Sequence, residues 1–103
     1  MLVRVVEPGR LAFQLRKGEQ GLSVFDTRAV EPALQESEIL AVFRSSSQMV
    51  ERSREEIESM GLMVVRLPGT EVLPERLRRA HAEIRPGSAM TRTQFKQALM
   101  ELE

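Results

Sequence analysis

Residues 61–69 read GLMVVRLPG, a β-prone run enclosed by turn-forming residues. Its valines favour an extended strand over residues 62–67, and the pair Pro68-Gly69 ends that strand. Gly61, just before it, is suited to the left-handed end of a preceding helix. We expect residues 62–67 to form a central strand, so this stretch predicts a sheet-based fold rather than a helical bundle.

Four short helices are predicted around this strand from local signals. Ser53 and Thr91 each precede a glutamate or glutamine by three residues, which is the form of a helix capping box. Pro74 stands where proline is favoured at the start of a helix, and apolar residues recur at helical spacing between Ala33 and Phe43. The predicted helices cover residues 33–43, 54–60, 75–80 and 93–101.

Several other segments have the pattern of short strands. Residues 7–10 contain Pro8-Gly9 and predict a turn that joins residues 2–6 and 11–16 in a hairpin. Within residues 11–16 apolar and more polar side chains alternate, so we expect Gln14 and Arg16 to share one face. The predicted strands are residues 2–6, 11–16, 22–26, 48–52, 62–67 and 81–85.

Mixed helices and strands with short connections predict one small α+β domain over residues 1–103. We expect a mixed or split β-sheet with three to four short helices. A central part of the sheet should contain residues 11–16, 62–67 and 82–85. The predicted core consists of Phe13, Leu15, Phe25, Leu40, Phe43, Ile57, Val65, Leu67, Ile84, Phe95 and Leu99.

Composition limits the possible functions. The 103 residues include 15 basic and 15 acidic side chains, so the neutral chain gives no overall charge for binding nucleic acid or a membrane surface. Cysteine is absent and there is a single histidine, which excludes thiolate and multi-histidine metal sites. No apolar run reaches the length of a membrane span and no secretory signal is visible, so we expect a cytoplasmic protein without a metal.

Charge is nevertheless uneven along the chain. Six basic residues and only the acid Glu83 lie between Arg76 and Lys96, whereas glutamates dominate residues 31–58. A basic side of the fold would suit a phosphate. An ordinary solvated face explains the same pattern, and nucleic-acid binding is a weaker interpretation because the chain has only four aromatic residues.

The strand predicted over residues 81–85 carries the candidate chemistry. Its alternation directs His81, Glu83 and Arg85 to one side, opposite Ala82 and Ile84. Histidine and glutamate so placed could hold ribose hydroxyls or stabilise positive charge developing at an anomeric carbon. The same spacing also fits the polar outer face of an edge strand.

Two blocks of the sequence resemble one known family. The first block is residues 21–26, GLSVFD, and the second begins with residues 68–74, PGTEVLP. The second block continues through Arg76, Leu77, His81, Ile84, Pro86 and Met90. Together these blocks resemble the toxin-domain family with an ADP-ribosyltransferase-like fold that is known from bacterial type VI secretion effectors.

The resemblance implies a domain that binds NAD as a substrate in a cleft between two sheets and transfers ADP-ribose to an acceptor. Ser23 and His81 stand inside the matching blocks, whereas Arg16 and Glu83 are chosen by geometry. Arg16 would face the phosphates, Ser23 the ribose or nicotinamide, and His81 with Glu83 the ribose and the developing charge. We expect Arg16, Ser23 and a partly exposed His81 to share one cleft.

Other interpretations stay open. The chain is short for a transferase and has no tyrosine or tryptophan to stack on nicotinamide, so activity could be reduced or lost. A non-enzymatic protein-interaction or scaffold domain is the alternative. Small size, uneven charge and the serine run at residues 45–47 support it.

Overall fold

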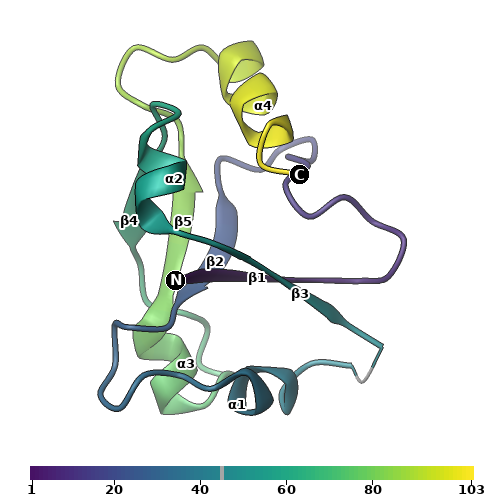
Figure 1. Cartoon of the computed structure of the whole chain (residues 1–103), viewed down its shortest axis with the longest axis vertical. Coiled ribbons are helices and arrows are strands. Elements are labelled where there is room, and N and C mark those ends of the chain that lie inside the picture. Colours follow the sequence, from purple (N-terminus) through teal and green to yellow (C-terminus); the bar gives the residue numbers. More distant parts are fainter. Residues whose placement is uncertain (45) are drawn as a thin grey trace.

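Five strands and four helices make up the computed structural model, which describes residues 1–44 and 46–103 (Figure 1). The strands are β1 (Leu2–Val6), β2 (Leu22–Asp26), β3 (Gln48–Arg52), β4 (Met63–Arg66) and β5 (His81–Arg85). The helices are α1 (Glu36–Leu40), α2 (Arg54–Glu58), α3 (Glu75–Ala80) and α4 (Arg92–Met100). The predicted small α+β fold is therefore confirmed. Ser45, part of the serine run, lies outside the described residues.

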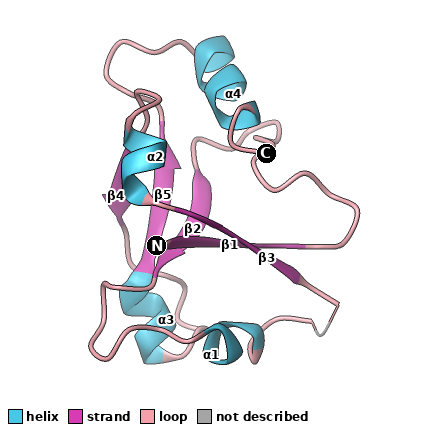
Figure 2. Ribbon diagram, viewed as in Figure 1, coloured by secondary structure: helices cyan, strands magenta, loops and turns pink. Residues whose placement is uncertain are grey.

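The strands form one sheet in the order β3-β1-β2-β5-β4, and its strand pairs are antiparallel. β1 and β2 are in register only where Leu2 lies opposite Asp26 and Val3 opposite Phe25. Beyond that point the two strands diverge, and Figure 2 shows β1 and β3 crossing the direction of β2, β5 and β4. The sheet is thus continuous but splayed between β1 and β2.

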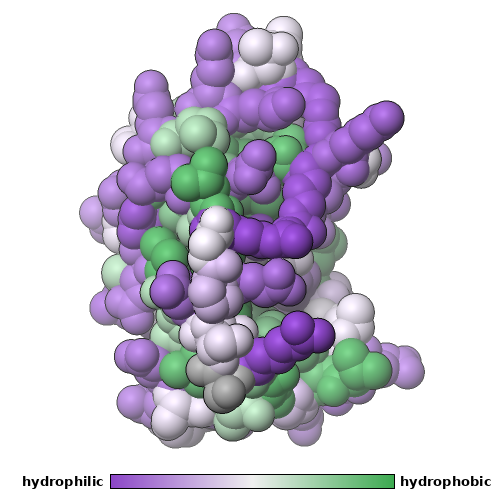
Figure 3. Space-filling view, turned by 90° about the vertical axis from the view of Figure 1, so that its right-hand side faces the viewer, coloured by the Kyte–Doolittle hydropathy of each residue, from purple (hydrophilic) through white to green (hydrophobic). Residues whose placement is uncertain are grey.

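The two faces of the sheet pack against different helices because side chains alternate along each strand. One face joins strand residues such as Val24 and Ile84 to Ile57 of α2 and Phe95 of α4 in the larger core. The other face joins Phe25 and Val3 to α1 and α3 in a smaller core. On the face shown in Figure 3, hydrophilic side chains predominate, with smaller apolar areas between them.

Local signals explain the helix ends. The Ser53 hydroxyl accepts a hydrogen bond from the Glu56 N–H, and the Thr91 hydroxyl accepts one from Gln94, as the capping patterns predict. After α2 the chain turns through Gly61 at φ +81°, a conformation that favours glycine. No helix in residues 1–44 or 46–103 has the length and apolar character needed to cross a membrane.

The prediction of a strand over residues 11–16 is wrong. The Ala12 and Phe13 N–H groups donate to the Glu103 carboxylate at 2.9 and 2.6 Å, and Arg4 Nε donates to the Ala12 carbonyl. The backbone N–H and carbonyl groups that would pair with a neighbouring strand are thus hydrogen-bonded to side chains instead. Ala12 and Phe13 are also buried in succession, which strand alternation does not allow.

Three further expectations need correction. β4 lies at the edge of the sheet rather than at its centre, because β5 pairs with it on one side only. α1 is shorter than the predicted helix over residues 33–43. Seven predicted core residues are buried, but four are only half-buried: Leu40, Phe43, Val65 and Leu67. Val65 lies on the edge strand, and Phe43 and Leu67 line a surface cavity.

Candidate functional site

The two sequence blocks lie side by side in the sheet. β2 and β5 pair so that Ser23 lies opposite Glu83 and Phe25 opposite His81. Because residues directly opposite in a ladder share a face, these four side chains occupy the face that packs against α1 and α3. The pairing thus joins residues that are far apart in the sequence.

A cavity of about 470 Å³ opens over this face, and we call it the β2–β5 cleft. Strand residues form its floor, and the loop between β4 and α3 forms one wall. The volume falls within the range of roughly 300–1,000 Å³ that is usual for small-molecule sites. Its lining consists of Arg4, Val5, Ser23, Phe25, Phe43, Leu67, Pro68, Gly69, Thr70, Leu73, His81 and Glu83.

His81 is partly exposed and fixed in orientation. Its Nδ1 lies 2.9 Å from the Leu67 carbonyl oxygen. A carbonyl can only accept, so Nδ1 carries a proton and donates, and Nε2 is the acceptor when the ring is neutral. The ring also meets Phe25 edge to face, with centroids 5.9 Å apart. A substrate hydroxyl could therefore donate to Nε2 without disturbing the anchor.

Glu83 is held by its neighbour on the same strand. The Arg85 guanidinium lies 2.9 Å from Glu83 Oε1 through both Nε and Nη2, and the carboxylate remains about one-quarter exposed. This ion pair keeps Glu83 extended along the sheet surface. A carboxylate in this place can stabilise a nearby positive charge, although Arg85 already neutralises part of its own charge.

Arg4 fills the splay between β1 and β2. Its Nη1 donates to the Ser23 carbonyl at 2.8 Å, while Nε donates to Ala12. Burial lowers the pKa of Arg4, and the nearby charges of Glu19 and Glu103 oppose that change. The guanidinium remains charged near neutral pH, because arginine is not deprotonated in proteins. Arg4 therefore brings a fixed positive charge to the β2–β5 cleft.

Arg16 does not join this group, so the expectation that it shares a cleft with Ser23 and His81 is wrong. It lies in an irregular segment and lines a separate hollow of about 380 Å³ together with Arg4 and Gln14. Its backbone N–H donates to Glu19, and its carbonyl accepts from Arg92. The expected strand that would have directed Arg16 toward Ser23 is absent from this segment.

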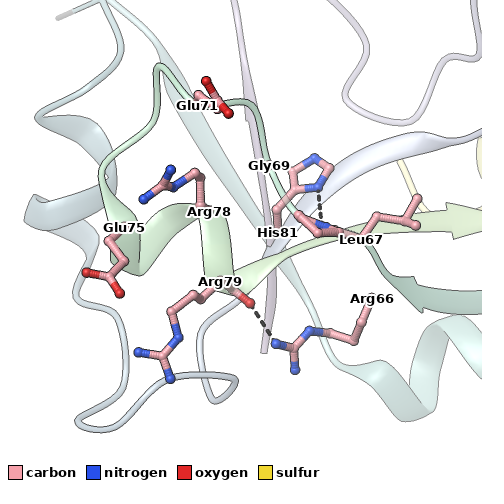
Figure 4. Close-up of a pocket in the computed structure, with 9 residues that line it drawn as sticks. Arg66, Leu67, Gly69, Glu71, Glu75, Arg78, Arg79 and His81 are labelled. Atoms are coloured by element: carbon pink, nitrogen blue, oxygen red, sulfur yellow. Dashed lines mark hydrogen bonds between the residues drawn. The ribbon is translucent and has the colours of Figure 1, made fainter.

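A second hollow, of about 640 Å³, lies on the other side of the loop after β4. We call it the arginine hollow because Arg66, Arg78 and Arg79 line it (Figure 4). Its other lining residues are Leu67, Pro68, Gly69, Glu71, Glu75 and His81. The two cavities share His81 and the segment Leu67-Pro68-Gly69, so this loop separates them.

Gly69 allows the loop after β4 to pack closely against the end of α3. Its N–H donates to the Arg78 carbonyl at 3.1 Å, which holds the loop against the end of α3. A Cβ atom at this position would lie 2.9 Å from Leu73 Cδ1 and 3.2 Å from Arg78 Cα. A larger residue would therefore require the Leu73 side chain to turn away and the Arg78 backbone to shift by a few tenths of an ångström.

Three features of the site were not predicted from the sequence. The signal for Arg4 is that it is the one charged residue in the otherwise apolar strand over residues 2–6. Phe43, assigned to the core, lines the cleft and meets Phe25 with ring centroids 6.0 Å apart. No local signal indicates that Arg66 meets the end of α3.

Comparison with known proteins identifies no relative of this chain. No protein-family model, no curated protein and no solved structure matches the chain.

Proposed function

We propose that this chain is an NAD-binding, ADP-ribosyltransferase-like domain of the toxin type, with the β2–β5 cleft as its site. The observation that carries the proposal is the pairing of β2 with β5, which sets Ser23 beside Glu83 and places His81 in the same cavity. These residues are the polar groups on which the family resemblance and the strand alternation depend. A cytoplasmic location belongs to the proposal because NAD is an intracellular dinucleotide.

The chemistry needs few groups. The bond between ribose C1′ and nicotinamide breaks, nicotinamide leaves with the electron pair, and the acceptor nucleophile forms the new bond to C1′ and loses its proton. Glu83 stabilises the positive charge that develops on the ribose. His81 accepts a hydrogen bond from a ribose hydroxyl through Nε2, and the Ser23 hydroxyl contacts the ribose or nicotinamide. The acceptor could be a macromolecule or, in simple hydrolysis, water.

The proposal assigns the pyrophosphate to Arg4 instead of Arg16. Arg4 lines the same cavity as Ser23 and His81, whereas Arg16 does not. A guanidinium held by two carbonyls is already oriented, so less conformational freedom is lost on binding. Phe25 and Phe43 supply an apolar surface for the nicotinamide ring in place of tyrosine or tryptophan.

Ser23→Ala is the sharpest binding test. Ser23 is exposed, and no hydrogen bond joins its hydroxyl to another described residue, so this hydroxyl can be removed without loss of a structural contact. We expect NAD affinity, measured by saturation-transfer difference NMR and calorimetry, to fall about three- to tenfold with an unchanged melting temperature. The matched control is Ser37→Ala, an exposed serine on α1 outside the cleft.

Glu83→Gln tests catalysis separately. The amide keeps the shape of the side chain but removes the charge, so nicotinamide release from NAD should fall on the order of 100-fold while NAD affinity changes little. The folded wild-type protein failing to bind millimolar NAD would overturn the proposed function. Binding without any nicotinamide release would leave an NAD-binding domain that has lost catalysis.

A further inference from the structure

The arginine hollow contains positive charge that the protein itself does not neutralise. Four ion pairs join side chains in the described part of the chain, and none of them includes Arg66, Arg78 or Arg79. Arg76 on the same helix differs, because it pairs with Glu38 at 2.6 Å. The unpaired charges therefore come from the end of β4 and from the residues of α3 that line the hollow.

Two of these arginines are arranged as a pair. Arg66 Nη2 donates to the Arg79 carbonyl at 2.6 Å, which fixes the Arg66 guanidinium beside the C-terminal end of α3. Figure 4 shows the Arg66 and Arg79 guanidinium groups pointing to the same side of this helix end. No carboxylate pairs with either guanidinium among the described residues, so an anion bound on this side would meet two positive charges that are not neutralised.

The acidic residues of the hollow do not provide this anion. Glu71 and Glu75 line the hollow, but neither forms an ion pair with its arginines in the described residues. The guanidinium fork matches the oxygen geometry of phosphate and can form two parallel hydrogen bonds. The volume of about 640 Å³ also leaves room for a group attached to the phosphate.

We propose that the arginine hollow binds the terminal phosphate group of a small phosphomonoester, with Arg66 and Arg79 as its ligands. This site is separate from the β2–β5 cleft and does not depend on the proposed NAD chemistry. The ligand's remaining atoms lie along the hollow toward Arg78 and the loop Leu67-Pro68-Gly69. His81 borders both sites, and the loop Leu67-Pro68-Gly69 lies between them.

Amide NMR titrations test this site with adenosine 5′-monophosphate, adenosine and inorganic phosphate as probes. We expect the monophosphate to shift the Arg66, Gly69 and Arg79 amide signals, and adenosine at the same concentration to leave them unchanged. Inorganic phosphate distinguishes the two sources of the anion. If it binds as tightly as the monophosphate, the ligand is free phosphate; if it binds more weakly, the attached group contributes.

Arg66→Gln and Arg79→Gln should each weaken monophosphate binding about tenfold, since each removes one charged hydrogen-bond donor. Arg28→Gln is the matched control, because it removes the same charge from an exposed residue that lines neither cavity. Equal weakening by Arg28→Gln would overturn the proposal, since the effect would then come from overall charge. Equal binding of adenosine would overturn it as well.

NAD separates this inference from the proposed function. We expect NAD to shift Ser23 rather than Arg66, and Arg66→Gln to leave NAD affinity unchanged. A failure of NAD to bind while the monophosphate still binds would affect only the proposed function. Displacement of the monophosphate by NAD, with NAD binding weakened by Arg66→Gln, would overturn the separate site by making the hollow part of the NAD cleft.

Discussion

The two faces of the sheet use the same strands for different purposes. On the face against α2 and α4, inward residues such as Leu22, Val24 and Ile84 are apolar and fully buried. On the opposite face, the neighbouring positions in the same strands are Ser23, Glu83 and other polar or partly exposed residues. Since the period of a strand is two, one sequence alternation places the larger core on one face and the smaller core with the polar β2–β5 cleft on the other.

This difference shows where each face can tolerate change. The larger core is close-packed, so the loss of a side chain there leaves a void. On the cleft face, the polar side chains His81 and Glu83 contact a main-chain carbonyl and a neighbouring arginine rather than the apolar core. Mutations on the two faces should therefore affect different measurements: stability on one face and ligand binding on the other.

Phe95→Ala should produce the largest loss of stability. Phe95 lies on α4, is 1% exposed and joins the larger core. Removing a buried phenylalanine costs about 3–5 kcal/mol, which approaches the whole stability of a small domain. Urea unfolding measures the change, and Met100→Ala on the exposed side of the same helix is the control. A loss below about 1 kcal/mol would contradict the packing of this face.

Gly69→Ala should disturb the loop that separates the β2–β5 cleft from the arginine hollow. The new Cβ would press on Leu73 and on the backbone of Arg78, so the loop or α3 must move. Overpacking of this kind costs about 1–3 kcal/mol. We expect amide signals lining both cavities to shift, whereas Thr70→Ala, an exposed neighbour, should leave the arginine hollow unchanged. Shifts confined to one cavity would show that the loop is not a shared wall.

The helices and most strands could be predicted because their signals are local. Ser53 and Thr91 act on N–H groups three residues away, and the alternation of β5 is visible within five residues. Residues 11–16 have the same alternation but form no strand, because Ala12 and Phe13 bond to Glu103, which is 91 and 90 residues away. A local pattern cannot show such distant partners.

The candidate site shows the same difference between local signals, which the sequence reveals, and distant contacts, which it does not. Ser23, His81 and Glu83 could be placed on strand faces from alternation, and the pairing of β2 with β5 brings them together. Alternation alone could not show which of the two arginines, Arg4 or Arg16, lines the cleft. Which arginine reaches the cleft depends on the splay between β1 and β2, and that splay arises from the packing of the whole sheet.

The smallest expected effect concerns an ion pair that ties α1 to α3 beneath the cleft. Arg76 Nε donates to Glu38 Oε2 at 2.6 Å, and Arg76 also donates to the Pro32 carbonyl. The hydrogen bond from Arg76 holds the pKa of Glu38 below its ordinary value, with a smaller opposing effect of burial. The same contact raises the pKa of Arg76, which stays charged.

A lowered carboxyl pKa stabilises the folded state at pH values above the ordinary glutamate value of about 4.3, and this contribution disappears as the pH falls through the lowered pKa. Glu38→Gln should therefore slightly lower the urea midpoint at pH 7. The difference in urea midpoint between Glu38→Gln and the wild-type protein should narrow below about pH 4.3 and vanish at lower pH. Glu36→Gln removes the same charge from α1 without touching Arg76, so it serves as the control for net charge. A Glu38→Gln difference that stays constant down to acid pH would show that Glu38 acts through packing rather than through its charge.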